Sequence, residues 1–443
     1  MNNIKKILCL VLGAAVISSA FVGCKSSSDD NSKQTISQKD PKDYKGEITF
    51  WHFNKDEAPV LVKHFNEKYP NVKVKLQVIS DQNQGYQNKI TTTLASGGSG
   101  MPDVYCGESA FVKRFVNMDN GFEDLSQSQY KLDDVTSKMA KYTVDIGTDD
   151  KGKVKALTYQ ITPGGIGYKR DLAKKYFGTD DPDQIASMMS SVDKLIDMAK
   201  QLKEKSNGSV KFFASRQEIE RLYMGARQTG WVKDNKLVID PMMDKYVATA
   251  KIMRDDKLEA GYDAWTQPWT TAVAGNDVFA YAIPTWGVAN IIGADDPNNK
   301  DTGRWAMAKA PINYFWGGTW LGVYSKSKNK DLAWQFVKTI VSDEDSLKSW
   351  TQQTGDIINN TKLIGDLAQN SDINKTTNQN LNKFFQPLIS DINGTIFTEY
   401  DDKITSDWDD NMATYLSGKI SKDDMYKKFK EKVKADFPKL TVE

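Results

Sequence analysis

Tryptophan residues are concentrated in one stretch of the sequence, residues 265–320, among small and polar side chains. Six of the eleven tryptophans fall there, together with Tyr281: Trp265, Trp269, Trp286, Trp305, Trp316 and Trp320. Indole faces stack on the CH-rich faces of pyranose rings, whose hydroxyls pair with carboxylate, amide and guanidinium groups. The stretch therefore has the side chains that contact with sugar rings would need.

The same tryptophans could instead belong to the protein core, because large indoles are mostly buried on average. Trp305 begins an apparent strand, 305–308, which favours packing. Trp286 follows a strand and Pro284, where ligand contact is favoured. Gly317 and Gly318 lie between Trp316 and Trp320, and glycine allows the backbone to approach a ligand closely. For Trp265, Trp269, Trp316 and Trp320, both interpretations remain open.

The elements that must position a site are clearest between Gly46 and Ser109. The sequence predicts a strand at 47–53, an amphipathic helix at 56–69 and an alternating strand at 72–78, then a second helix and a short apolar strand at 104–106. That order indicates parallel pairing with right-handed crossovers. In such sheets ligands bind beyond the carboxyl ends of the strands, which brings together Trp51, His52, Glu108 and Ser109.

Several segments resemble extracellular solute-binding proteins of ABC importers, and more narrowly the carbohydrate-binding family that includes maltose-binding protein. They are FWHF, FNEKYPNVKV and NKITTTLASGGSGMPDVYCGES near the amino terminus, then FAYAIPTWGVANI and GGTWLGVYSKSKNKDLAWQFVKTIVSDE. The resemblance covers nearly the whole chain after its leader. It implies a periplasmic-binding-protein-like α/β fold with two lobes, a hinge and a ligand cleft between them.

The resemblance also implies lobe boundaries and contact residues. The first lobe is expected to comprise residues 46–158 plus 304–352, and the second 159–303 plus 353–443. Trp51, Glu108 and Trp286 lie where this family contacts its solute, while packing remains an alternative for Trp51. The full set of candidate ligand contacts is Trp51, His52, Glu108, Ser109, Trp265, Trp269, Trp286, Trp316, Gly318 and Trp320.

The amino terminus has the pattern of a lipoprotein signal. Lys5 and Lys6 precede an apolar run that is shorter than the ~20 residues needed to span a bilayer, and the run ends in Gly23 and Cys24. Residues 1–23 are therefore predicted to be a signal peptide, Cys24 a lipidated residue, and 24–45 a disordered tether. The alternative is an ordinary secretory signal with an incidental cysteine.

Charge and missing motifs exclude several other functions. Removing Lys5 and Lys6 from the 59 basic residues leaves 57 against 58 acidic ones, a net charge of −1, which argues against nucleic acid as a partner. Phosphate-binding loops, zinc-protease motifs and nucleophile elbows do not occur in the sequence, so no cofactor or metal is expected. The aspartates at 401, 402, 407, 409 and 410 are interpreted as a solvated helix face, and Cys106 as a buried packing residue.

Together these observations predict a monomeric, non-enzymatic protein outside the cytoplasm, held on the outer face of the cell membrane by lipid on Cys24. It would close two lobes around a small-molecule carbohydrate, with the tryptophans favouring an oligosaccharide, and deliver it to an ABC transporter permease. Two alternatives stay open. A glycosidase could use two of the 58 acidic residues, and a glycan-binding adhesin would use an open groove.

Overall fold

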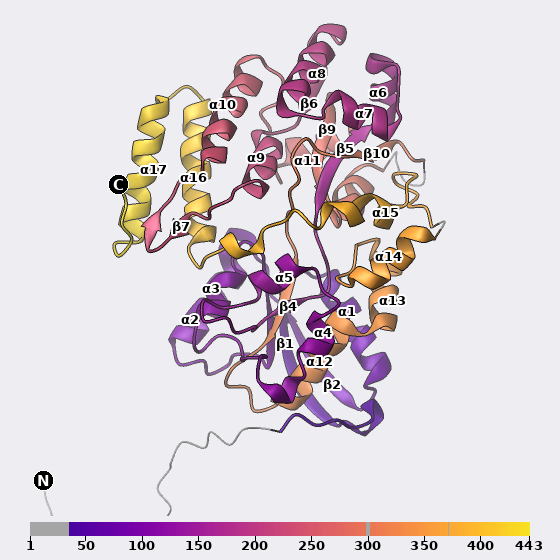
Figure 1. Cartoon of the computed structure of the whole chain (residues 1–443), viewed down its shortest axis with the longest axis vertical. Helices are drawn as coiled ribbons and strands as arrows, with labels where there is room; N and C mark the ends of the chain where they lie inside the picture. Colours follow the sequence, from indigo (N-terminus) through magenta and orange to yellow (C-terminus); the bar gives the residue numbers. More distant parts are fainter. Residues whose placement is uncertain (1–34, 298–301, 371) are drawn as a thin grey trace, which may run out of the picture. The chain divides into compact units, whose positions relative to one another are not determined.

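The structure, a computed structural model, describes residues 35–297, 302–370 and 372–443. The predicted signal peptide and Cys24 lie outside the described residues. From Ile36 to Glu443 the chain forms one unit that contains two main sheets (Figure 1). Each sheet is the centre of one lobe.

The first sheet has five strands in the order β2-β1-β3-β11-β4. Their bounds are β1 Gly46–His52, β2 Val72–Val78, β3 Val104–Glu108, β4 Leu157–Thr158 and β11 Thr319–Val323. Strand β1 pairs in parallel with β2 and β3, which confirms the predicted parallel pairing. Strand β11 pairs antiparallel with β3. The carboxyl ends of β1 and β3 therefore meet at one edge, next to the beginning of β11.

Helices cover this sheet because their apolar residues recur on one face. In α1 (Glu57–Lys68), Ala58, Leu61 and Phe65 are buried. The ring of Phe65 packs 5.0 Å from that of Phe336 in α12 (Lys330–Ser342), which also lies against Phe50 of β1. The other helices of this part are α2 Gly85–Ala95, α3 Val112–Asn117, α4 Asp133–Thr136, α5 Lys141–Ile146 and α13 Glu344–Thr354.

The second sheet has four strands in the order β10-β5-β9-β6. They are β5 Gly164–Lys169, β6 Lys211–Phe213, β9 Val278–Pro284 and β10 Trp305–Ala308. Strand β10 pairs antiparallel with β5 along its whole length, so the predicted return to the first lobe at residue 304 is too early. A buried apolar run such as 305–308 predicts a strand but does not indicate which sheet it joins.

The other elements of the chain include a small hairpin and a series of helices. A small hairpin, β7 Val232–Lys233 and β8 Lys236–Leu237, turns at Asp234 and Asn235, both with positive φ. The helices are α6 Arg170–Phe177, α7 Pro182–Met188, α8 Val192–Lys205, α9 Arg216–Gly225, α10 Pro241–Asp255, α11 Gln267–Ala274, α14 Thr361–Gln369, α15 Leu381–Phe385, α16 Asp401–Leu416 and α17 Lys422–Asp436.

Three segments link the two sheets and pair with one another. The Ile161 amide donates to the Ile357 carbonyl at 3.0 Å, the Gly164 amide to Tyr314 at 2.9 Å, and the Trp316 amide to Thr162 at 3.1 Å. The segments 159–164, 313–316 and 357–359 therefore form a narrow hydrogen-bonded hinge. Gly355, shortly before the third segment, ends α13 with a φ of 71°.

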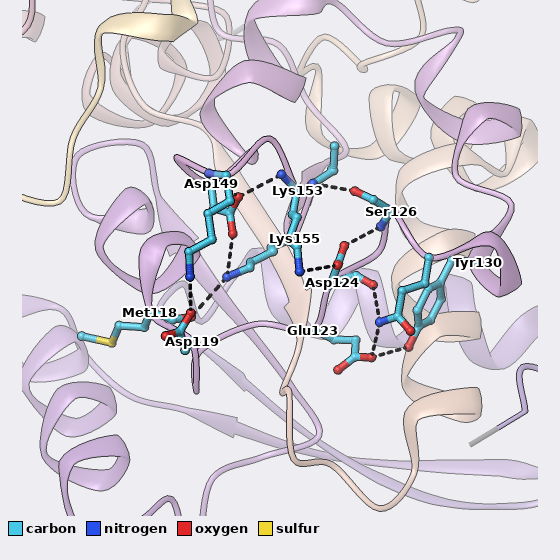
Figure 2. Close-up of polar contacts among 12 residues, drawn as sticks. Met118, Asp119, Glu123, Asp124, Ser126, Tyr130, Asp149, Lys153 and Lys155 are labelled. Carbon is cyan, nitrogen blue, oxygen red and sulfur yellow. Dashed lines mark hydrogen bonds and ion pairs between the residues drawn. The ribbon is translucent and has the colours of Figure 1, made fainter. Parts of the chain in front are cut away.

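A polar network holds the loop that follows α3 to the turn at 149–152 (Figure 2). The Lys155 ammonium lies 3.0 Å from Asp149, both side chains being almost fully buried, and it also donates to the Met118 carbonyl at 3.3 Å. Lys153 pairs with Asp124 at 3.1 Å, and Ser126 accepts from the Val154 amide. The buried charges of Lys155 and Asp149 are therefore paired with each other, which fixes this corner of the first lobe.

The predicted tether, residues 24–45, extends too far along the chain, because residues 36–45 belong to the folded unit. The Ser37 amide donates to Asp331 of α12 at 3.0 Å, and the Tyr44 hydroxyl donates to the Ser37 carbonyl at 2.7 Å. Tyr44 is buried, with its ring 5.5 Å from that of Tyr69. One large aromatic residue in a polar stretch thus anchors it to the first lobe.

Candidate functional site

Four of the candidate tryptophans form one cluster, although they come from three separate parts of the chain. Trp265 lies in the turn before α11, Trp269 in α11, Trp286 directly after β9, and Trp316 in the hinge segment 313–316. The Trp265 ring lies 5.3 Å from that of Trp269, 6.1 Å from Trp286 and 5.6 Å from Trp316. The Trp286 and Trp316 rings are 4.9 Å apart. We refer to these four residues as the tryptophan cluster.

Hydrogen bonds fix two members of the cluster. The Trp286 indole donates to the Trp316 carbonyl at 2.9 Å, and the Trp269 indole donates to Glu218 at 2.8 Å. Gly317 has a φ of 81°, and a Cβ atom there would lie 2.7 Å from the Trp286 indole nitrogen. A glycine is therefore needed at 317 for the hinge segment to lie against Trp286.

The end of β3 contacts the chain just after Trp316, at Gly318. The Ser109 amide donates to the Gly318 carbonyl at 3.2 Å. Glu108 accepts from the Ser109 hydroxyl at 2.7 Å and from the Ala110 amide at 3.0 Å. Burial and the nearby carboxylate of Asp402 raise the pKa of Glu108, against the lowering effect of these two donors. The end of β3 therefore places a carboxyl group on the strand that pairs with the beginning of β11, which follows Trp316 by three residues.

Two residues that the sequence analysis missed support the tryptophan cluster. The Arg221 guanidinium lies over the Trp316 ring, 3.6 Å from its centre, and pairs with Glu218 at 2.8 Å. Glu218 is fully buried and also accepts from the Ala282 amide at 2.8 Å. Both residues lie in α9, where an acid and a base three residues apart are usually a solvent-exposed pair. No local signal indicates that this pair faces tryptophans 50 to 100 residues away.

The other candidates lie in the interior. Trp51 is 6% exposed, and Trp320, whose indole donates to the Thr143 carbonyl, is 1% exposed. Both pack in the core of the first lobe, and Trp269 is equally buried within the cluster. In this conformation only Trp265, Trp286 and Trp316 expose part of their indole surface. The sequence analysis left packing open for Trp51, Trp269 and Trp320, and the structure shows that they do pack.

Two residues with potential acid-base or nucleophilic chemistry are buried in uncharged form. His52 accepts from the Asn54 amide at 2.9 Å, and burial lowers its pKa to about 3. Cys106 lies inside β3 beside the Tyr86 hydroxyl, and burial raises the pKa of its thiol to about 12. Imidazolium and thiolate are both disfavoured near neutral pH, so neither residue is placed for catalysis.

Of the five aspartates of α16 expected to form a solvated face, only Asp410 is exposed. Asp401 and Asp407 are buried, and Asp407 pairs with Lys403 of the preceding turn. Asp402 pairs with Arg114 of α3 at 3.2 Å, and Asp409 pairs with Arg216 of α9 at 2.7 Å. Their partners are distant in sequence. In the described part of the chain, no group of three or more histidine, cysteine or acidic side chains is placed to hold a metal ion.

Two carboxyl groups, the half-buried Glu57 and the buried Asp356, lie at the hinge. Glu57 accepts from the Tyr159 hydroxyl at 2.8 Å, and Asp356 accepts from the Gln160 side chain and from the Ile357 amide at 2.8 Å. Burial is the main cause that raises the pKa of Glu57 to about 7 and that of Asp356 to about 6, and the nearby charge of Asp356 adds to the shift of Glu57.

The raised pKa of Glu57 predicts a pH-dependent stability. The folded protein keeps a proton that the unfolded chain loses, so this stabilisation is full below pH ~4.5 and is lost as the pH rises through about 7. Glutamine does not titrate, so the Glu57→Gln variant should gain free energy of unfolding relative to wild type as the pH rises from 5 to 8. The expected gain is on the order of 1 kcal/mol, less than the full pKa shift would give, because Glu57 is partly exposed and solvent screens its charge. Thermal melting across that range measures this gain. The control is Glu67→Gln, at an exposed position on the same helix. If the melting temperature of Glu57→Gln changed with pH as steeply as that of the wild type, the raised pKa of Glu57 would be contradicted.

The comparisons with known proteins agree with this architecture. Residues 60–376 match the family of bacterial extracellular solute-binding proteins, and the chain belongs to that family. It is a two-lobed α/β protein of a class that binds solutes. Among its described residues, none of the helices has the length and apolar character to cross a membrane.

Solved structures share the fold at low sequence identity. The GacH receptor of Streptomyces glaucescens, solved unliganded and with acarbose, aligns with a TM-score of 0.70 at 20% identity, covering 90% of this chain and 99% of that one. The galacto-N-biose/lacto-N-biose I-binding protein of Bifidobacterium longum has a TM-score of 0.70 at 16% identity, covering 90% and 99%. The sugar-binding protein MalE of Xanthomonas citri has 0.71 at 15%, covering 89% and 98%.

Proposed function

We propose that the chain binds a carbohydrate of oligosaccharide length at the tryptophan cluster and delivers it to the permease of an ABC transporter. The observation that carries this proposal is the group of partly exposed indoles of Trp265, Trp286 and Trp316. Glu108 ends β3 and pairs with Thr319 at the beginning of β11, and the Arg221 guanidinium lies over the Trp316 ring. Aromatic faces with a few hydrogen-bonding side chains match the alternating CH and hydroxyl surface of a sugar.

The proposed mechanism is closure of the two lobes around the sugar. Glu108 belongs to the first lobe and Trp286 to the second, while Trp316 lies in a segment that links them. A ligand that contacts both lobes favours the closed population by as much as it binds that state more tightly. Structures with the same fold were solved with acarbose and with lacto-N-biose, which supports a carbohydrate as the solute class.

Residues 26–443 tested against mono- and oligosaccharides would show whether the solute is a sugar. We expect at least one oligosaccharide to raise the melting temperature, to shift the tryptophan emission and to be recovered intact. Cleaved sugar would favour a glycosidase. Binding of a polymeric glycan without lobe closure, measured by small-angle X-ray scattering, would favour an adhesin. A panel without any response would contradict carbohydrate as the ligand.

We further propose that lipid on Cys24 holds the protein at the outer face of the cell membrane. Processing would make Cys24 the first residue, and the polar residues after it would form a short tether to the folded unit. The Cys24→Ala variant should leave the membrane fraction, while Cys106→Ala, which removes the buried thiol, should not. Equal membrane recovery of Cys24→Ala and wild type would contradict lipidation at Cys24.

A further inference from the structure

Trp265 has a backbone conformation that bulky residues rarely adopt. Its φ is +68°, in the left-handed region that favours glycine. The turn around it is fixed on both sides, because the Ala264 amide donates to the Gln217 side chain at 2.7 Å and the Thr266 hydroxyl donates to the Asp263 carbonyl at 2.6 Å. Strain of this kind persists where the surroundings impose it, and it is concentrated at ligand clamps and switch regions.

The Trp265 indole is also the most exposed large apolar side chain in the described ranges, at 59%, ahead of Ile373 at 51%. Its nitrogen donates no hydrogen bond to any described residue, whereas the Trp269 and Trp286 indoles each donate one. The Trp286 side chain is therefore fixed in position by its hydrogen bond to the Trp316 carbonyl. The Trp265 indole is held only by its backbone turn and by ring contacts with its neighbours, so side-chain rotation can move it relative to Trp286.

The two indoles stack on each other with their rings offset, so Trp265 covers the Trp286 face that a sugar ring would use. Their planes are within 11° of parallel, and their ring centres are 6.1 Å apart. Fully overlapping rings in contact would be ~3.5–4.0 Å apart, and a sugar ring between two indoles needs about twice that spacing. A small outward movement of Trp265 would accommodate one ring, with Trp286 beneath it.

On the basis of the carbohydrate binding proposed above, we infer that one pyranose ring of the ligand binds between Trp265 and Trp286. A ring enclosed on both faces must present CH groups on both, as a gluco-configured ring with equatorial hydroxyls does. An axial hydroxyl, as at C4 of a galacto-configured ring, would point at an indole face and lose its hydrogen bonds to water without replacement. Trp265 therefore selects gluco-configured over galacto-configured rings.

Calorimetric titration with two pairs of disaccharides tests this selection, because the members of each pair differ only in the C4 configuration of one ring. The pairs are cellobiose with lactose, and isomaltose with melibiose. We expect the wild type to bind at least one gluco member about tenfold more tightly than its partner. In the Trp265→Gly variant, the affinity for that sugar should fall at least tenfold. The ratio of the affinities for the gluco and galacto members of the pair should approach one.

The matched control is Lys257→Gly. Lys257 is exposed, lies in the same lobe and also has a positive φ, 53°, so glycine relieves backbone strain there without removing an aromatic ring. Trp265→Gly should keep or raise the melting temperature, as Lys257→Gly does, while only Trp265→Gly loses affinity. A residue that merely packs would lose stability instead.

Each remaining outcome counts against a different statement. Wild-type binding that is unchanged in Trp265→Gly, or tighter binding of a galacto member, overturns the role of Trp265 and leaves carbohydrate binding intact. Absence of binding to all four disaccharides overturns the gluco-configured ring site. Absence of binding to the wider oligosaccharide panel as well overturns the proposed function.

Discussion

The Trp286→Ala variant is expected to bind its sugar about a hundredfold more weakly than the wild type, a loss of ~2.7 kcal/mol. Trp286 packs against both partly exposed neighbours in the tryptophan cluster, Trp265 and Trp316. Its indole is held in place by the bond to the Trp316 carbonyl and by the close approach of Gly317. Its removal eliminates the fixed aromatic face and one ring contact of each of the two neighbouring indoles, Trp265 and Trp316.

Isothermal titration calorimetry measures this loss, with the sugar identified in the panel as titrant. Trp286→Phe is the matched comparison, because it keeps an aromatic face of smaller area and should lose about tenfold. Trp334→Phe, in the core of the first lobe on α12, controls for the loss of any tryptophan. Wild-type affinity in a folded Trp286→Ala protein would remove the tryptophan cluster from the binding site.

The largest expected effect on stability follows from Glu218→Ala. The Glu218 carboxylate is fully buried and accepts from the Trp269 indole, the Ala282 amide and the Arg221 guanidinium, all at 2.8 Å. Alanine leaves these three donors without an acceptor, one of them charged. Removing one partner of a buried charged pair costs about 3–5 kcal/mol, which for a unit of this size lowers the melting temperature by roughly 3–6 °C.

Differential scanning calorimetry of Glu218→Ala measures this cost directly. Glu204→Ala, an exposed glutamate in α8, provides the control and should change the stability by less than ~0.5 kcal/mol. Glu218→Gln should fall between the two, because an amide can still accept one of the three hydrogen bonds. A melting temperature for Glu218→Ala equal to that of the control would contradict the assigned network.

The sequence predicted the first lobe well where the periodicity of side chains is strong. The helix at 56–69 and the alternating strand at 72–78 are observed as α1 and β2. Each depends on a local pattern of burial, which the sequence shows directly. The sheet membership of β10 could not be predicted in this way, because it depends on pairing between Trp305–Ala308 and residues about 140 positions earlier.

The arrangement of the candidate site residues could not be predicted from the sequence. Trp265 and Trp269 are separated by one helical turn's length of sequence, yet one is 59% exposed and the other fully buried. The positive φ of Trp265 decides this difference, and no sequence pattern indicates it. The roles of Glu218 and Arg221 depend on tertiary contacts with Trp269 and Trp316, so a helical acid-base pair is uninformative before folding.

A crystal structure of residues 26–443 with the tightest-binding sugar of the panel would test carbohydrate binding by the two lobes most directly. The account predicts a sugar ring in contact with the Trp286 indole, hydroxyls hydrogen-bonded to Glu108 of the other lobe, and Trp265 against the opposite face of the ring. A sugar bound without contact to the tryptophan cluster, or held by one lobe alone, would contradict it.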